Sequence, residues 1–260
     1  METVNIKVLA KALNLSISTV SRALRDSYDI SEQTKQRVRE MAAQMNYQPN
    51  PHASSLRHQK SKTIAVVIPE IDNNFFTLAI NGIESVAQEK GYHVLIYMTH
   101  EDYTKEESFL KHLHNGRVDG VLISLSGTTR DYSHLTDLQR KNIPLVLFDR
   151  VYEPLNTNKV TTDDLESGYI ATEHLIQRGC TRIAYLMISK DLSIGTNRRK
   201  GYLKALMDHK IPVDESLVLN CSNDNKKNVA ALVELLSRSN RPDGLFASVE
   251  RLAMNSYEAC

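Results

Sequence analysis

Four residues near the N-terminus combine hydroxyl groups, a guanidinium and an apolar side chain at helical spacing. Ile17, Ser18, Ser21 and Arg22 share one face of a helix, because residues three and four apart are neighbours on a helix surface. They would stand near the N-terminal end of that helix, and this end of a recognition helix is the part that reaches base edges in the major groove. The spacing therefore predicts a DNA-reading helix that begins near residue 17.

The sequence around these four residues predicts two short helices with a turn between them. Asn5 can cap a first helix that ends near Leu13, and Asn14 suits the left-handed backbone of a turn. Ser16 can cap the second helix. The pattern predicts a helix-turn-helix, and the alternative is an ordinary three-helix bundle that does not bind DNA.

Apolar residues at helical spacing are expected to hold these helices together, and a third helix is expected to open at Ser31. The residues expected to face inward are Val8, Leu9, Ala12 and Leu13, with the small Ala10 beside them, then Val20, Ala23 and Leu24, then Val38, Met41, Ala42 and Met45.

A further short helix is predicted to begin at Pro51, with Asn50 as its N-cap. Ala53 and Leu56 lie three apart on one face, and Arg57 follows. A helix of about two turns is too short to be stable alone, but an apolar wedge flanked by basic residues suits a DNA minor groove. The alternative is a polar linker, which describes residues 58–62 well.

Positive charge is concentrated at the N-terminal end of the chain. Residues 1–62 hold ten Lys and Arg against five Asp and Glu, and the remainder holds 22 against 26. Phosphate contact requires this kind of excess. The sequence has no signal-like N-terminal segment and no stretch long enough to span a membrane, so we expect a cytoplasmic protein. Its three cysteines are expected to be reduced thiols.

After residue 62 the chain alternates short apolar runs with amphipathic helices, which predicts α/β architecture with parallel sheets covered on both faces. Ligands bind such sheets at the carboxyl ends of the strands. The expected strands are 64–68, 94–98, 121–123, 145–148, 183–188, 217–219 and 244–249, and the expected helices are 76–90, 105–114, 131–141, 165–178, 196–210 and 226–239.

The order of these motifs resembles the LacI family of bacterial transcription regulators over essentially the whole chain. The residues that carry the resemblance are the helix-turn-helix, Asn46-Tyr-Gln-Pro-Asn50, Ala53-x-x-Leu56, Asn73-Asn-Phe-Phe76, Val118-Asp-Gly-Val-Leu-Ile-Ser124, Pro144-Leu-Val-Leu-Phe-Asp-Arg150, Val160-Thr-Thr-Asp-Asp164 with Gly168, His174-Leu-Ile-Gln-Arg-Gly179 and Arg198-Arg-Lys-Gly-Tyr-Leu-Lys-Ala205.

The resemblance implies three parts: an all-α helix-turn-helix domain at 1–48, a hinge helix and linker at 49–62, and a two-lobed effector-binding and dimerisation domain at 63–260. Its lobes would lie at about 63–160 and 161–260, in the manner of periplasmic binding proteins. The family's second lobe continues beyond the seventh strand, so the second lobe is expected to be incomplete here. The residues expected to contact DNA are Asn5, Ser16, Ile17, Ser18, Ser21, Arg22, Ser31, Thr34, Tyr47, Asn50, Ala53, Leu56 and Arg57.

Strand ends supply the candidates for an effector cleft. Phe75 and Phe76 follow the first strand and could stack on a sugar or a base, although Phe76 could instead belong to the core. Ser124 ends the third strand and Asp149 the fourth. Asp149 can accept hydrogen bonds from paired hydroxyls, and the alternative is an ion pair with Arg150.

The second lobe offers a less complete match. Arg198 stands where the family places an effector-contacting arginine, and the alternative is a surface charge. The family usually has Asn-Asp after the seventh strand, whereas this chain has Val249-Glu250. An amide that would bind a sugar hydroxyl is therefore missing.

The sequence thus predicts a regulator, most simply a repressor, of a carbohydrate-utilisation operon. It would act as a homodimer on a pseudo-palindromic operator, with a sugar or sugar phosphate as effector. The alternatives are a purine- or nucleoside-responsive regulator, a solute-binding module and an enzyme with a DNA-binding head. No nucleotide-binding, metal or nucleophile motif is present in the sequence, so no catalytic residue, metal or cofactor is expected.

Overall fold

The computed structural model describes residues 4–47, 60–72, 74–113 and 116–260. The chain forms two compact units, one up to residue 59 and one from residue 60 onward. The predicted hinge helix, with Asn50, Ala53, Leu56 and Arg57, lies outside the described residues.

Three helices make up the N-terminal unit, which we call the head. They are α1 (Ile6–Leu13), α2 (Ile17–Leu24) and α3 (Glu32–Gln44). Asn5 caps α1 by accepting hydrogen bonds from the amides of Lys7 and Val8, at 2.9 and 3.2 Å. Ser16 caps α2, and Asn14 between them has a φ of 54°. These local predictions are confirmed.

The core of the head is smaller than the sequence predicts. The buried apolar residues are Leu9, Ala10, Leu13, Val20, Ala23, Val38 and Ala42. Val8 and Ala12 were expected to face inward and are exposed instead. In a helix of two turns, the stripe through Leu9, Ala10 and Leu13 already faces α2 and α3, so Val8 points to solvent.

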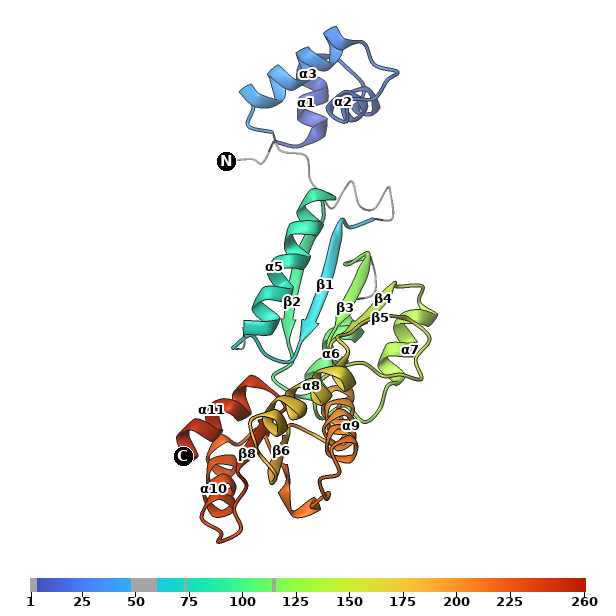
Figure 1. The fold of residues 1–260 in the computed structure, drawn as a ribbon. Helices are drawn as coiled ribbons and strands as arrows, with labels where there is room; N and C mark the ends of the chain where they lie inside the picture. Colours follow the sequence, from blue (N-terminus) through green and yellow to red (C-terminus); the bar gives the residue numbers. More distant parts are fainter. Residues whose placement is uncertain (1–3, 48–59, 73, 114–115) are drawn as a thin grey trace. The chain divides into compact units, whose positions relative to one another are not determined.

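The second unit begins with a five-stranded parallel sheet in the order β2-β1-β3-β4-β5. Helix α5 runs along one side of this sheet (Figure 1). The elements of this first lobe are β1 (Thr63–Ile68), α5 (Asn74–Glu89), β2 (His93–Met98), α6 (Tyr103–Leu113), β3 (Gly120–Ile123), α7 (Ser133–Arg140), β4 (Leu145–Phe148) and β5 (Asn158–Val160).

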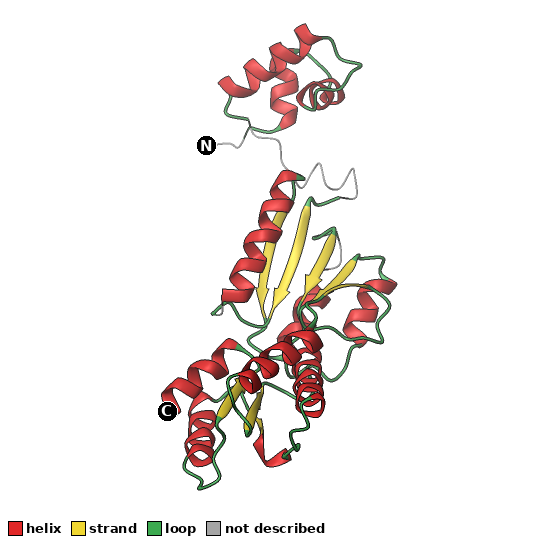
Figure 2. Ribbon diagram, viewed as in Figure 1, coloured by secondary structure: helices red, strands yellow, loops and turns green. Residues whose placement is uncertain are grey.

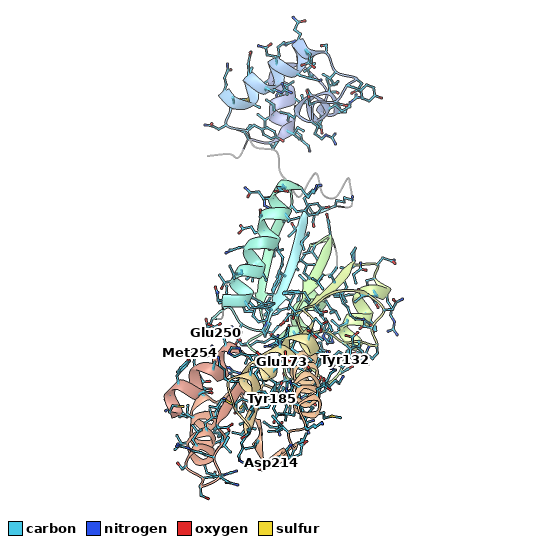
Figure 3. All side chains as sticks on the ribbon, in the orientation of Figure 1. Tyr132, Glu173, Tyr185, Asp214, Glu250 and Met254 are labelled. Atoms are coloured by element: carbon cyan, nitrogen blue, oxygen red, sulfur yellow. The ribbon has the colours of Figure 1, made fainter. Side chains whose placement is uncertain are left out.

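The second lobe has its own parallel sheet in the order β7-β6-β8, with helices around it (Figure 2). The central strand is buried throughout and carries Tyr185 (Figure 3). The ring of Tyr185 stacks on that of Tyr202, and both side chains are buried. The elements are α8 (Asp164–Gln177), β6 (Ile183–Met187), α9 (Ser193–Asp208), η1 (Glu215–Leu217), β7 (Val218–Asn220), α10 (Asn225–Leu236), β8 (Gly244–Ala247) and α11 (Glu250–Ala259).

The predicted fold class is confirmed: a helical N-terminal region precedes parallel-sheet α/β lobes. The differences from the prediction include one additional strand and two shifted element ends. Strand β5 was not predicted, because its short polar sequence at a sheet edge lacks an apolar run. Helix α9 starts at Ser193, ahead of the predicted residue 196. The strand predicted to run to Val249 ends at Ala247, because Val249 already begins the turn into α11.

Candidate functional site

The outer face of α2 presents the side chains that the sequence predicts to read DNA. Ile17 is 46% exposed although it is apolar, and Ser18 and Arg22 are exposed beside it. Ser21 is half-buried. The Ser16 hydroxyl lies 2.8 Å from the hydroxyls of both Ser18 and Thr19, so the N-terminus of α2 carries a small cluster of hydroxyl groups.

The other predicted DNA contacts of the head occupy two kinds of position. Asn5 and Ser31 are exposed N-cap residues, and Thr34 is half-buried, with its hydroxyl 2.9 Å from that of Ser31. Helix N-termini of this kind favour anionic groups such as phosphates. Tyr47 packs partly buried against the head core, and this burial raises the pKa of its phenol.

A cleft between the two lobes holds four of the five predicted effector residues. It has a volume of about 130 Å³ and is open to solvent. Its walls come from the carboxyl ends of strands in both sheets, where ligands of parallel sheets bind. The lining residues are Glu70, Phe75, Phe76, Asp149, Arg150, Ile188, Ile194, Arg198, Val249, Glu250 and Arg251. Glu250 lies at the start of α11 (Figure 3).

Asp149 follows β4 with a φ of 59°, a left-handed conformation that aspartate tolerates better than most residues. The Ser124 hydroxyl donates to Asp149 Oδ2 at 3.3 Å from beneath the cleft floor. Ser124 itself is fully buried, so it supports Asp149 and does not line the cleft. Burial raises the pKa of Asp149, and the charges of Arg150 and Arg198 oppose that rise.

Arg198 reaches the cleft from the first turns of α9. Its Nε donates to Asp164 Oδ1 at 2.8 Å, and its NH1 donates to the carbonyl of Ser248. Asp164 is 5% exposed and opens α8. The guanidinium is therefore held between α8 and the end of β8, with its remaining donors available at the cleft.

Sequence reasoning treated Arg150 only as a partner for Asp149, and the structure gives it a larger part. Its side chain is 3% exposed and donates to both carboxylate oxygens of Glu101, at 2.7 and 2.9 Å. The distance from its Nε to Asp149 is 3.8 Å, and this buried Nε has no hydrogen-bond partner among the described residues. The adjacency of Asp149 and Arg150 after a strand was the only signal in the sequence.

The two phenylalanines divide between core and cleft. Phe76 is 1% exposed and packs against Val66, Ile68 and Phe148, so its alternative as a core residue is correct, although its edge still lines the cleft. Phe75 is 44% exposed and meets Phe76 edge to face at 5.3 Å. Phe75 is thus the aromatic surface that the cleft offers a ligand.

The described ranges contain neither a candidate metal cluster nor a candidate membrane-spanning helix. No group of three or more His, Cys, Asp or Glu side chains there is placed to hold a metal ion. Nor does any helix in those ranges have the length and apolar character needed to cross a bilayer. Cys180, Cys221 and Cys260 are free thiols.

A helix-turn-helix head joined to two parallel-sheet lobes that enclose a cleft defines a class: regulators whose ligand-binding part is built like a periplasmic binding protein. Family comparison makes this specific. Residues 5–50 match the model of bacterial regulatory proteins of the lacI family, and residues 61–260 match that of periplasmic binding proteins and the sugar-binding domain of the LacI family. The chain belongs to the LacI family and is a DNA-binding transcription regulator.

The individual relatives are named as transcriptional repressors. The chain is 29% identical to the transcriptional repressor PurR of Vibrio atlanticus over 249 residues, which cover 96% of this chain and 74% of the relative. It is also 29% identical to the ribose operon repressor of Haemophilus influenzae over 255 residues, covering 98% and 76%. The lac repressor dimer bound to operator and an anti-inducer superposes with a TM-score of 0.84, over 99% of this chain and 77% of that one, at 21% identity.

Proposed function

We propose that this protein represses a carbohydrate-utilisation operon and that a neutral sugar, bound in the cleft between its lobes, controls its affinity for operator DNA. The observation that carries the proposal is that Asp149 and Arg198, which come from different lobes, line the same solvent-open cleft. A ligand that touches both lobes can favour one lobe arrangement over another, and only such differential affinity shifts an equilibrium.

The charges in the cleft favour a ligand rich in hydroxyls over a phosphorylated one. Arg150 already faces Glu101, and Arg198 already faces Asp164. Asp149 lines the cleft as a further acceptor, and burial raises its pKa although the charges of Arg150 and Arg198 oppose that rise. Paired sugar hydroxyls can donate to that carboxylate, whereas a phosphate would have to compete with Glu101 and Asp164 for Arg150 and Arg198. The third arginine of the cleft wall, Arg251, already donates to Asn223.

Replacing Asp149 by Asn is therefore expected to weaken effector binding by about 10- to 100-fold, since hydrogen bonds to a charged group contribute about 1.5–3 kcal/mol. Titration of the full chain with a panel of neutral sugars and sugar phosphates, followed by calorimetry, measures this. Asp137→Asn is the matched control, because it makes the same substitution at an exposed position outside the cleft. Equal losses in both variants would remove Asp149 from the effector site.

The same residue gives the cleft a pH dependence. Burial raises the pKa of Asp149, so on acidification it takes up a proton earlier than an ordinary aspartate. As the pH falls, effector affinity should therefore begin to decline at a pH above the usual titration range of aspartate. The Asp149→Asn variant should lack that decline. By linkage, the raised pKa stabilises the ligand-free fold below the unfolded-state value, and this contribution is lost as pH rises through the folded-state value.

The head supports the DNA-binding half of the proposal. Exchanging Ile17 and Ser18 for the side chains of another regulator is expected to change operator preference by about 1–3 kcal/mol for each affected base pair. Selection from a random duplex library, before and after the exchange, measures the preference. An exchange at Gln36 and Glu40, exposed on α3, serves as control. An unchanged selected sequence would show that another face reads the operator.

A purine effector is the second candidate, and Phe75 is the observation that favours it. A half-exposed aromatic ring in a ligand cleft can stack on a flat base as readily as on a sugar face. The PurR relative is matched as well as the ribose operon repressor. Including hypoxanthine, guanine and adenosine in the same titration separates the two candidates.

We also propose that the protein acts as a homodimer paired through α5 and β2. Leu78 and Val86 on α5 are 61% and 57% exposed, and they border a largely apolar hollow on the first lobe. Strand β2 is a sheet edge with Leu95 and Ile96 exposed. Apolar patches and open edges of this kind mark interfaces, and a second copy of this chain would bring two heads to the two halves of an operator. Sedimentation of the full chain measures the assembly.

A further inference from the structure

The arginine on the DNA-facing side of α2 is tied to the loop that follows this helix. Arg22 NH1 lies 2.5 Å from Asp29 Oδ2, and its Nε lies 3.4 Å from the carbonyl of Ser18. The two side chains of the pair are 46% and 34% exposed, so solvent screens their attraction. An exposed pair contributes little to stability, and its consequence is therefore geometric.

The loop that carries Asp29 is itself fixed at both ends. At its start, Asp26 binds Lys35 and Arg39 of α3 at 3.1 and 2.8 Å. At its end, Ile30 packs partly buried against the head core, directly before the N-cap of α3. Asp29 thus stands on a support that the core and α3 hold in place.

The carboxylate of Asp29 is also held in its charged form. A hydrogen bond from the Ser27 side chain and the nearby charge of Arg22 keep the pKa of Asp29 below its usual value. The carboxylate therefore stays charged and oriented at neutral pH.

A long arginine side chain on a helix surface samples many rotamers, and selecting one of them costs binding free energy. A guanidinium has five N–H groups, so holding one nitrogen against Asp29 leaves donors for a base. We propose that Asp29 is a positioning residue that fixes the direction in which Arg22 presents its guanidinium to one operator base pair. This inference rests on the proposed DNA-binding role of α2.

The test compares Asp29→Asn with Glu32→Gln in the full chain. Both variants remove one negative charge from this end of the head, but only Asp29 touches Arg22, whereas the exposed Glu32 pairs with Lys35. The probes are the duplex that the wild-type protein selects from a random library and the single-base-pair variants of that duplex. The base pair read by Arg22 is the one whose substitution weakens the wild type but not Arg22→Ala.

At that base pair we expect Asp29→Asn to reduce the wild-type discrimination by about three- to tenfold, part of what a good bidentate arginine contact supplies. Discrimination at all other positions should be unchanged, and Glu32→Gln should leave every position unchanged. Both variants should strengthen binding to all duplexes by a similar factor, because each removes repulsion from the phosphates. Asp29→Glu should restore part of the discrimination.

Three results separate the failures. Equal discrimination by Asp29→Asn and Glu32→Gln, with both variants folded by circular dichroism, overturns the positioning role. An Arg22→Ala variant that keeps wild-type discrimination at every base pair also overturns the positioning role. That result would still be compatible with DNA binding by the head. A wild-type protein that selects no sequence at all overturns the proposed function itself.

Discussion

Replacing Gly201 by alanine is expected to force helices α8 and α9 apart and to abolish the response to effector. An added Cβ at this position would overlap the carbonyl oxygen of Leu165 and would lie 2.5 Å from the amide nitrogen of Tyr169. Both are backbone atoms of α8, which cannot rotate away as a side chain can. A second glycine, Gly168, makes the reciprocal close approach to the backbone of Arg198.

The close crossing of α8 and α9 positions the two residues of an ion pair at the cleft, Arg198 and Asp164. Arg198 lies one turn before Gly201 on α9, and Asp164 lies one turn before Gly168 on α8. Their 2.8 Å ion pair therefore depends on the distance between the two helix axes. We expect Gly201→Ala to destabilise the second unit by about 3 kcal/mol or more, because overpacking against backbone is relieved only by moving a whole helix.

Urea denaturation of the full chain measures the loss, and effector titration at low urea measures the response. Lys200→Ala introduces the same residue one position earlier, at an exposed site, and is expected to change stability by less than about 0.5 kcal/mol. A Gly201→Ala protein with wild-type stability and effector affinity would mean that α8 and α9 do not cross this closely.

The features that sequence reasoning predicts well are those that depend on neighbours along the chain. Asn5, Asn14 and Ser16 act within three residues of themselves, so their capping and turn roles follow from residue type. Asp149 was found at the cleft because the carboxyl ends of parallel strands meet at one edge of a sheet. The fold class could be predicted because apolar strands and amphipathic helices alternate along the chain.

The features that it missed depend on distant partners. Arg150 and Glu101 are 49 residues apart, and nothing near either residue reveals that their side chains meet inside the first lobe. Gly168 and Gly201 were recognised as motif residues, but a glycine pattern does not say which backbone comes close. Strand β5 forms only because β4 offers an open edge to a polar segment.

Phe76 shows how burial decides between two roles of one residue type. Adjacent phenylalanines begin the same helix, and the sequence cannot tell which one turns inward. The helix rotation sets Phe76 over Val66 and Ile68 and leaves Phe75 at the cleft. The first lobe's packing therefore selects the aromatic ring that a ligand meets.

Replacing Glu101 by Gln is expected to destabilise the first lobe by about 3–5 kcal/mol, the usual cost of leaving a buried charge without its partner. Glu101 neutralises Arg150 and also accepts a hydrogen bond from the amide of Gly127 at 2.6 Å. Glutamine keeps the shape and one carbonyl acceptor but loses the charge. Its amide would also set N–H donors against the donors of Arg150.

The double variant Glu101→Gln with Arg150→Met distinguishes a lost charge balance from a lost contact. Methionine has a comparable unbranched chain and no charge, so the double variant should regain at least about half of the lost stability, as buried ion pairs replaced by apolar residues often do. Asp137→Asn, which breaks the exposed pair with Arg140, is the control and should cost less than about 1 kcal/mol. Denaturant unfolding of the three variants measures these differences.

If Glu101→Gln cost no more than Asp137→Asn, Arg150 would have to be solvated in the native protein. The floor of the cleft would then be open to water, and the guanidinium would be free to bind a phosphorylated effector.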